Sequence, residues 1–185
     1  MTDPRPDLLK ALPEEIAARV SEALPDLRTC KAQAGRFDLD ALRKLGVAAP
    51  AVLVAVTRLA QSQTYAGPAP SFNVELAAFV ITKDGMGLPR DAAAMTICQA
   101  LLQLVPNRTW SLAGVGEAER VAALPLVTAA QDKLGASLWA VTWQQPISFD
   151  PLPASDPVAV ELYVAQHPNV GPDHAGDYDQ IGGTQ

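Results

Sequence analysis

The sequence predicts an α+β fold in which a mostly antiparallel sheet of about four strands is covered by two main helices. The first observation is a set of three apolar runs with strand character, residues 51–57, 72–82 and 138–144. The second is a three-to-four-residue apolar period in residues 7–24 and 89–105, which is typical of amphipathic helices. The third is the order of elements, namely helix, strand, short helix, two strands, helix and strands, which is typical of α+β proteins.

The first helix is predicted over residues 7–24, where one apolar stripe contains Leu8, Leu12, Ile16 and Val20. Pro13 complicates this stripe, because a proline in a helix interior removes a hydrogen bond and clashes with the preceding turn. Either the helix kinks at Pro13, or it begins at Leu12 with Pro13 as its first residue. Glu14 and Glu15 favour the later start, since acidic side chains are stabilised in the first turn of a helix.

An edge strand, a short helix and a buried strand are expected next. Residues 27–34 are polar and alternating, which predicts a strand at the edge of the sheet. Asp38 is well placed as the N-cap of a short helix that ends at Gly46. Residues 51–60 follow Pro50 and have an unbroken apolar centre, so we expect a central strand buried on both faces.

A long loop and the second main helix follow. Residues 61–71 are polar and contain Gly and Pro, which predicts an exposed loop that is long for a hairpin. Residues 72–82 return as a strand. After a turn, the helix of residues 89–105 begins at Pro89 and ends before Pro106.

The segment before the last strand is the least regular part of the body. Residues 107–117 are predicted to form a loop, and residues 118–124 fit a strand. Residues 126–134 fit either a strand or a single helical turn, and the sequence leaves both open.

The last strand, residues 138–144, carries two tryptophans on one face. Alternation places Trp139, Val141 and Trp143 on one side of a strand that is covered on both faces. Each tryptophan brings about 150–250 Å² of surface, which must meet a helix of the same chain or another molecule. Because two helices are available to cover the sheet, we expect this face to lie mostly in the core.

Composition indicates a soluble globular protein. Of the 185 residues, 49% are hydrophobic and 18% are charged, and no run approaches the roughly 20 apolar residues of a membrane span. The first residues lack the apolar core of a signal peptide, so we expect a cytoplasmic product. Cys30 and Cys98 have no metal-ligand spacing and are interpreted as small buried hydrophobic residues.

The net charge of −6 is concentrated near the C-terminus. Of the 20 acidic residues, six lie from Asp150 onward, where there is no Lys or Arg, so residues 1–149 hold 14 acids against 14 bases. The body therefore has no basic field that would attract nucleic acid.

We divide the chain into a domain of residues 1–149 and an acidic, Pro/Gly-rich arm of residues 150–185. In residues 158–164 apolar and polar side chains alternate, as in a strand that pairs with a neighbouring subunit. An unstructured tail is an equally weighted alternative.

No set of residues with catalytic, cofactor-binding or metal-binding character stands out. His167 and His174 lie in the arm, where Pro/Gly-rich chain does not promise the fixed geometry that a metal site needs. The body has no histidine to activate a serine or cysteine nucleophile. The two Gly-x-Gly sequences, at residues 85–87 and 114–116, are too short for phosphate-binding loops and are interpreted as turns. We therefore expect a protein that is not an enzyme and binds no cofactor.

Four stretches carry a family resemblance through their order and spacing. They are the opening helix, residues 34–38 with the following residues 42–56, the strand, turn and helix of residues 79–104, and residues 135–145. In these stretches the chain resembles the Mu-like phage tail terminator family, the tail-completion proteins of long-tailed phages, and both contractile and non-contractile tails stay open. The resemblance spans most of the domain and none of the acidic arm.

The resemblance implies a small α/β subunit that forms a hexameric ring on the head-proximal end of the tail tube. Such a ring ends tube polymerisation and presents a surface for attachment of the neck and head. The implied partners are further copies of the chain, the tail tube protein, a neck or head-completion protein and, in a contractile tail, the sheath protein. The implied location is the tail–neck junction of the virion, after synthesis in the host cytoplasm, with no cofactor, nucleic-acid specificity or membrane contact.

We place the contacts of such a ring in the loop of residues 61–71 and in the acidic arm. The loop is longer than a hairpin turn needs, and the arm differs from the body in its acidic, Pro/Gly-rich composition. The candidate interface residues are Gln61, Thr64, Tyr65, Pro68, Tyr163 and Tyr178. Two alternatives stay open. One is another neck or sheath-capping virion subunit, and the other is a small cytoplasmic enzyme or binding domain, which would have a pocket with convergent polar groups.

Overall fold

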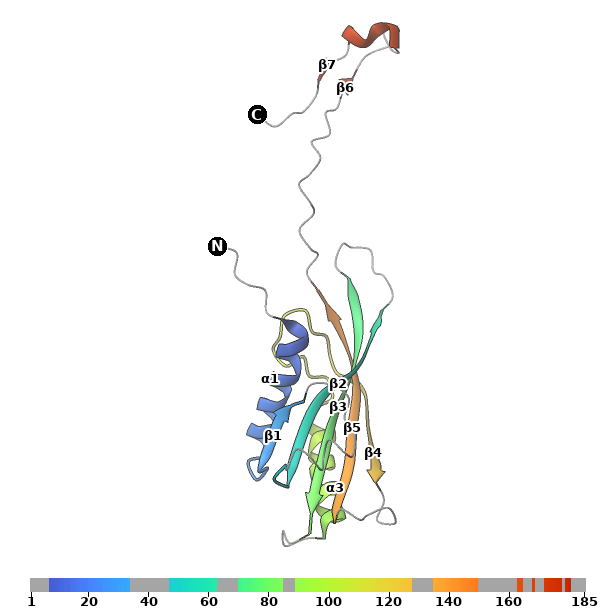
Figure 1. The fold of residues 1–185 in the computed structure, drawn as a ribbon. Coiled ribbons are helices and arrows are strands. Elements are labelled where there is room, and N and C mark those ends of the chain that lie inside the picture. Colours follow the sequence, from blue (N-terminus) through green and yellow to red (C-terminus); the bar gives the residue numbers. More distant parts are fainter. Residues whose placement is uncertain are drawn as a thin grey trace. The chain divides into compact units, whose positions relative to one another are not determined.

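The structure is a computed structural model that describes residues 7–33, 47–62, 70–84, 89–127 and 135–149, and, near the C-terminus, 163–164, 168, 172–177 and 179–180. Contacts divide the chain into two compact units, Met1–Asp150 and Pro151–Gln185. The first unit is an α+β body with a mostly antiparallel sheet and two helices (Figure 1). The fold class is as predicted, with five strands in the sheet rather than about four.

The sheet has the strand order β1-β2-β3-β5-β4. Its members are β1 (Thr29–Ala32), β2 (Ala51–Gln61), β3 (Ser71–Lys83), β4 (Glu119–Val127) and β5 (Ala136–Ser148). The short β1 pairs with β2 in parallel at one edge, and every other neighbouring pair is antiparallel. The predicted edge strand is confirmed by β1. The strand predicted over residues 118–124 is β4, which forms the other edge.

Helix α1 (Leu8–Ala23) corrects one sequence-based interpretation. Asp7 is its N-cap, and the Asp7 carboxylate accepts a hydrogen bond from the backbone N–H of Lys10 (3.3 Å). The helix therefore begins at Leu8 and not at Leu12, and Pro13 lies inside it as a buried residue. The physical reason is packing: the turn before Pro13 buries Leu8 and Leu12, and this burial offsets the one backbone hydrogen bond that proline cannot make.

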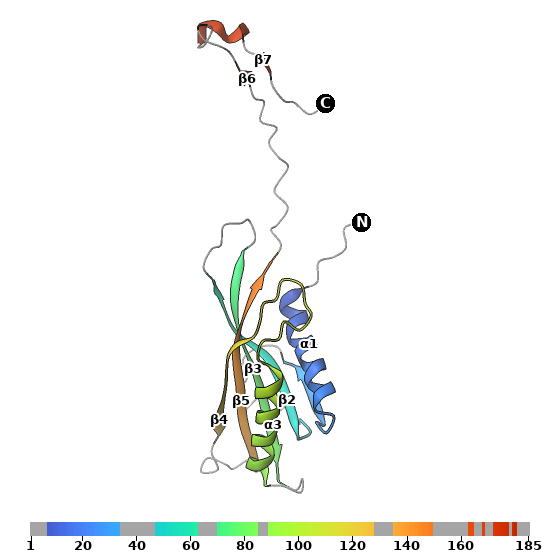
Figure 2. The ribbon, with the colours of Figure 1, turned by 180° about the vertical axis from the view of Figure 1, so that it is seen from behind.

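Helix α3 (Arg90–Leu104) agrees with the prediction, since it follows Pro89 and ends before Pro106. Figure 2 shows α1 and α3 side by side on the same face of the sheet. Both helices contribute apolar side chains to one large core, which includes Leu12, Ile16, Val20, Val52, Val54, Val80, Ala94, Cys98, Leu101, Val141 and Trp143.

Strand β5 is covered on both faces, as expected. Trp143 is only 2% exposed and lies in the core beneath the helices, while Trp139 is partly buried and packs against that core. The prediction that the tryptophan face lies mostly in the core is thus confirmed. On the opposite face, Leu138 and Ala140 belong to a second buried cluster with Ala51, Leu53, Ala55, Ala77, Phe79 and Ile81. This cluster also confirms that the apolar centre of β2 is buried on both faces.

Several predictions fall on residues that the structure does not describe. These are the short helix from Asp38 to Gly46, the hairpin loop over residues 63–69, and residues 128–134. Residues 105–118 form an irregular connection between α3 and β4, in agreement with the predicted loop. In the second unit, β6 (Tyr163–Val164) pairs with β7 (Asp179–Gln180), and the 3-10 helix η2 (Pro172–Asp177) lies between them in the sequence.

Candidate functional site

A buried glutamine near the end of β5 holds the connection between α3 and β4, residues 105–118, which we call the α3–β4 loop. Gln145 is fully buried, and its Oε1 accepts hydrogen bonds from Nε1 of Trp110 (3.0 Å) and Nε1 of Trp143 (3.2 Å). Its Nε2 donates to the carbonyl oxygens of Arg108 (2.8 Å) and Gly116 (2.7 Å). A glutamine amide offers two acceptor and two donor positions, so Gln145 uses all of them.

Backbone hydrogen bonds close the α3–β4 loop on itself and join it to β5. The N–H of Asn107 donates to the carbonyl of Ala118 (3.0 Å), and the N–H of Ala118 donates to the carbonyl of Arg108 (3.0 Å). The N–H of Gly116 donates to the carbonyl of Pro146 in β5 (2.7 Å). The loop is therefore a fixed part of the body and not a loose connection.

The backbone of this loop adopts conformations that are unfavourable for most residues. Asn107, Trp110 and Ser111 have φ values of 60°, 57° and 57°. Gly114 has a φ of 80°, and a Cβ atom there would lie 2.6 Å from the carbonyl oxygen of Ser148, so only glycine fits. Non-glycine residues in the left-handed region cost about 1–3 kcal/mol each and persist where the surroundings enforce them, often at functional surfaces.

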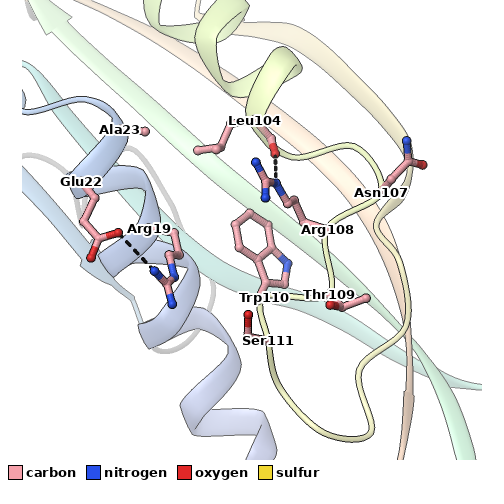
Figure 3. Close-up of a pocket in the computed structure, with 9 residues that line it drawn as sticks. All are labelled: Arg19, Glu22, Ala23, Leu104, Asn107, Arg108, Thr109, Trp110 and Ser111. Atoms are coloured by element: carbon pink, nitrogen blue, oxygen red, sulfur yellow. Dashed lines mark hydrogen bonds and ion pairs between the residues drawn. The ribbon is translucent and has the colours of Figure 1, made fainter.

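The α3–β4 loop and helix α1 enclose an open cleft of about 550 Å³. Figure 3 shows Arg19 and Glu22 of α1 facing the loop segment that carries Arg108 and Trp110. Trp110 is 4% exposed, because its ring packs into the core while its Nε1 bonds to Gln145. The lining consists of Arg19, Glu22, Ala23, Leu104, Asn107, Arg108, Thr109, Trp110 and Ser111.

The two arginines of the cleft differ in how their charge is compensated. Arg19 pairs with Glu15 (2.8 Å) and Glu22 (3.3 Å), and the hydrogen bond to Glu15, followed by the attraction of both carboxylates, raises the pKa of Arg19. The Nε of Arg108 donates to the carbonyl of Leu104 (3.3 Å). Within the described part of the chain, no carboxylate lies within ion-pair distance of Arg108. Arg108 thus presents an uncompensated charge at the cleft.

The expectation of two buried cysteines holds for Cys98, whereas Cys30 is partly buried. The Sγ of Cys30 donates to the carbonyl of Ala17 (3.1 Å), and Cys98 is a residue of α3 whose side chain is buried in the core. Burial raises the pKa of both thiols to about 11. Both are therefore protonated near neutral pH, and a protonated thiol is a poor nucleophile. Among the described residues, no group of three or more His, Cys, Asp or Glu side chains is arranged to hold a metal ion.

Of the six predicted interface residues, Gln61 and Tyr163 lie among the described residues, and they belong to different units. Gln61 is the last residue of β2, where it is exposed and pairs with Phe72, so hairpin pairing extends into the segment predicted as loop. Tyr163 lies in β6 of the second unit and pairs with Gln180. Thr64, Tyr65, Pro68 and Tyr178 lie outside the described residues.

The local pattern of residues 107–117 predicts only a connecting loop, so the α3–β4 loop was not among the predicted sites. One signal was present in the sequence. Gln145 is a polar residue that continues the tryptophan face of β5, at a position where alternation places a core side chain. A buried amide needs hydrogen-bonding partners. The pattern therefore indicates that Gln145 is bonded, but it does not identify the segment that supplies the partners.

Comparison with known protein families and with curated proteins found no match. In the described part of the chain, none of the helices is long and apolar enough to cross a membrane. The candidate site therefore rests on its own geometry: a fixed, strained loop, a cleft beside it and one arginine with uncompensated charge.

Proposed function

We propose that this chain is a structural virion protein that forms a ring on the head-proximal end of a phage tail tube. The ring ends tube polymerisation and offers a surface to which the neck and head attach. In this proposal the chain acts by surface complementarity and is not an enzyme. Its partners are further copies of itself, the tail tube protein, a neck or head-completion protein and, in a contractile tail, the sheath protein.

The observation that carries the proposal is where the stretches of family resemblance lie in the fold. The opening stretch is α1, residues 79–104 contain the end of β3 and all of α3, and residues 135–145 form most of β5. Strands β3 and β5 are hydrogen-bonded neighbours, and both helices contribute to the core against them. Stretches that are far apart in the sequence thus make one body, as expected if the resemblance reflects a common fold.

The site geometry supports a role in assembly. Heterologous contacts that repeat around a closed ring need surfaces of fixed shape on each subunit. The α3–β4 loop has such a fixed shape, because Gln145 and the backbone of β5 hold it. The second unit adds a part of distinct composition, with acidic residues and no Lys or Arg. In this proposal the body provides a surface of fixed shape, and the C-terminal unit provides negative charge.

Labelling of isolated tails tests the proposed location. Antibodies against this chain, coupled to gold, are expected to mark the head-proximal end of purified tails in electron micrographs. Labelling along the sheath or at the distal end would contradict the proposal. Labelling only on heads that lack tails would favour a head-completion subunit instead.

A further inference from the structure

We propose that the cleft between α1 and the α3–β4 loop of one copy receives the acidic C-terminal unit of a neighbouring copy. In this contact, Arg108 pairs with a carboxylate of the incoming unit. The inference rests on the proposed ring, because it names the surface through which two of its subunits are linked. It does not depend on what the ring caps.

The chemistry of the cleft fits a carboxylate. Arg19 pairs with two glutamates of α1, so the α1 side has one carboxylate in excess and Arg108 is the cation left for a ligand. Arg108 uses only its Nε, which leaves both terminal nitrogens of the guanidinium for a ligand. These nitrogens form a planar fork that matches the two oxygens of a carboxylate. The neighbouring side chains Thr109 and Ser111 are exposed and add hydroxyl donors at the same place.

Exposed arginines are common on protein surfaces. Arg108 differs from them because the loop that carries it is held in a fixed conformation. The Arg108 carbonyl accepts hydrogen bonds from both Gln145 Nε2 and the N–H of Ala118, so the backbone at Arg108 is fixed. Trp110 and Ser111 are held in the left-handed region beside it. A surface that is already ordered loses little conformational entropy when a ligand binds, which favours association.

The C-terminal unit is the part of this chain whose charge is complementary to Arg108. It holds acidic residues and no Lys or Arg, so its charge has no compensating base within the unit. Asp173, at the start of η2, and Asp179, in β7, are both exposed. Residues 151–162, the first twelve of this unit, precede β6 in the sequence and set an upper limit of about 40 Å on its distance from the end of the body. In a closed ring each copy then gives one acidic unit and receives one.

Cross-linking of the full chain tests the contact directly. A photoreactive amino acid replaces Ser111, and this protein is mixed with an equal amount of ¹⁵N-labelled chain that lacks the probe. After irradiation and digestion at aspartate, we expect the unlabelled loop peptide joined to a ¹⁵N-labelled peptide from residues 163–180. Links only within the unlabelled chain, links to other segments, or no links between chains would each overturn the proposal.

Charge variants provide the second test. Arg108→Gln is expected to weaken self-association of the full chain about fivefold, the upper range for an exposed ion pair. Arg28→Gln is the matched control, because Arg28 is exposed and lies outside the cleft. Equal effects of the two variants, or no effect of Arg108→Gln, would overturn the contact.

The two proposals fail in different ways. If the chain caps tails but the cross-link is absent, the docking contact is wrong and the capping function stands. If the cross-link forms but tails have normal length without this protein, the contact stands and the capping function is wrong.

Discussion

The α3–β4 loop and the C-terminal unit both lie outside the main sheet, yet they are built in opposite ways. The loop is tied to β5 by a fully buried amide and by backbone hydrogen bonds, and its strained residues are held in place. The C-terminal unit has a pair of two-residue strands and one 3-10 helix among its described elements, together with uncompensated acidic charge.

In the proposed ring, this difference gives the two parts different roles. A contact of defined geometry needs one surface that does not rearrange, and the loop provides it. Selectivity and rate of association depend more on complementary charge, which the acidic unit provides. Changes in the loop network should therefore reduce the stability of the body, whereas changes in the acidic unit should affect association alone.

The largest effect is expected at the buried amide. Gln145→Leu removes four hydrogen bonds and leaves two indole N–H groups and two carbonyls without their partner, so we expect a loss of about 4 kcal/mol of unfolding free energy. Urea unfolding followed by tryptophan fluorescence measures this loss. Gln144→Leu is the control, because Gln144 is partly exposed and bonds to the exposed Arg120. Losses of equal size at the two positions would contradict the role given to Gln145.

The two tryptophans of β5 offer a comparison within one strand face. Trp143→Ala is expected to cost about 3–5 kcal/mol, because Trp143 is fully within the core and bonds to Gln145. Trp139→Ala should cost about half as much, since Trp139 is only partly buried. Equal losses in thermal or urea unfolding would show that exposure of the Trp139 ring is not as described.

A glycine pair tests whether the loop must approach β5 closely. Gly114→Ala is expected to cost about 2 kcal/mol or more, because it combines a positive φ with a clash against the carbonyl of Ser148. Gly135→Ala shares the positive φ but has no neighbour within 4 Å, so it should cost about 1 kcal/mol. If Gly135→Ala destabilises the protein as much as Gly114→Ala, the close approach of residue 114 to the Ser148 carbonyl is not the reason that position 114 requires glycine.

The sequence predicted the parts of this fold that depend on local pattern. Alternation in β5 and the apolar period of α3 sufficed to place both elements, because each buries its apolar side chains in a regular repeat. Pro13 misled the interpretation of α1, since local rules count a lost hydrogen bond but not the burial of Leu8 and Leu12. The Gln145 network was beyond reach, because Trp110, Arg108 and Gly116 lie 29–37 positions away in the sequence.

Alkaline pH gives a smaller effect that reports on the body alone. Burial raises the pKa of the Cys98 thiol from 9.0 to about 11, so the folded state resists its ionisation. Stability is retained below pH 9 and lost as the pH rises from 9 to 11, with a loss of about 1 kcal/mol at pH 9.5. Melting temperatures of the protein and of Cys98→Ala across this range measure it, and identical pH profiles would contradict the assignment.

Removal of the acidic unit is expected to have the smallest effect on the body. A chain that ends at Asp150 should unfold with a free energy within about 0.5 kcal/mol of the full chain, because the two units are separate clusters of contacts. The same chain should associate less than the full one in sedimentation experiments. A large loss of stability would show that the acidic unit is part of the body, and the division of work would fail.

The length of tails made without this protein tests the central claim most directly. In a phage that carries a deletion of the gene, electron microscopy is expected to show tubes that exceed the normal length and vary widely, with few heads attached. Supply of the intact chain from a plasmid should restore a single tail length. Tails of normal, uniform length in its absence would contradict the capping function.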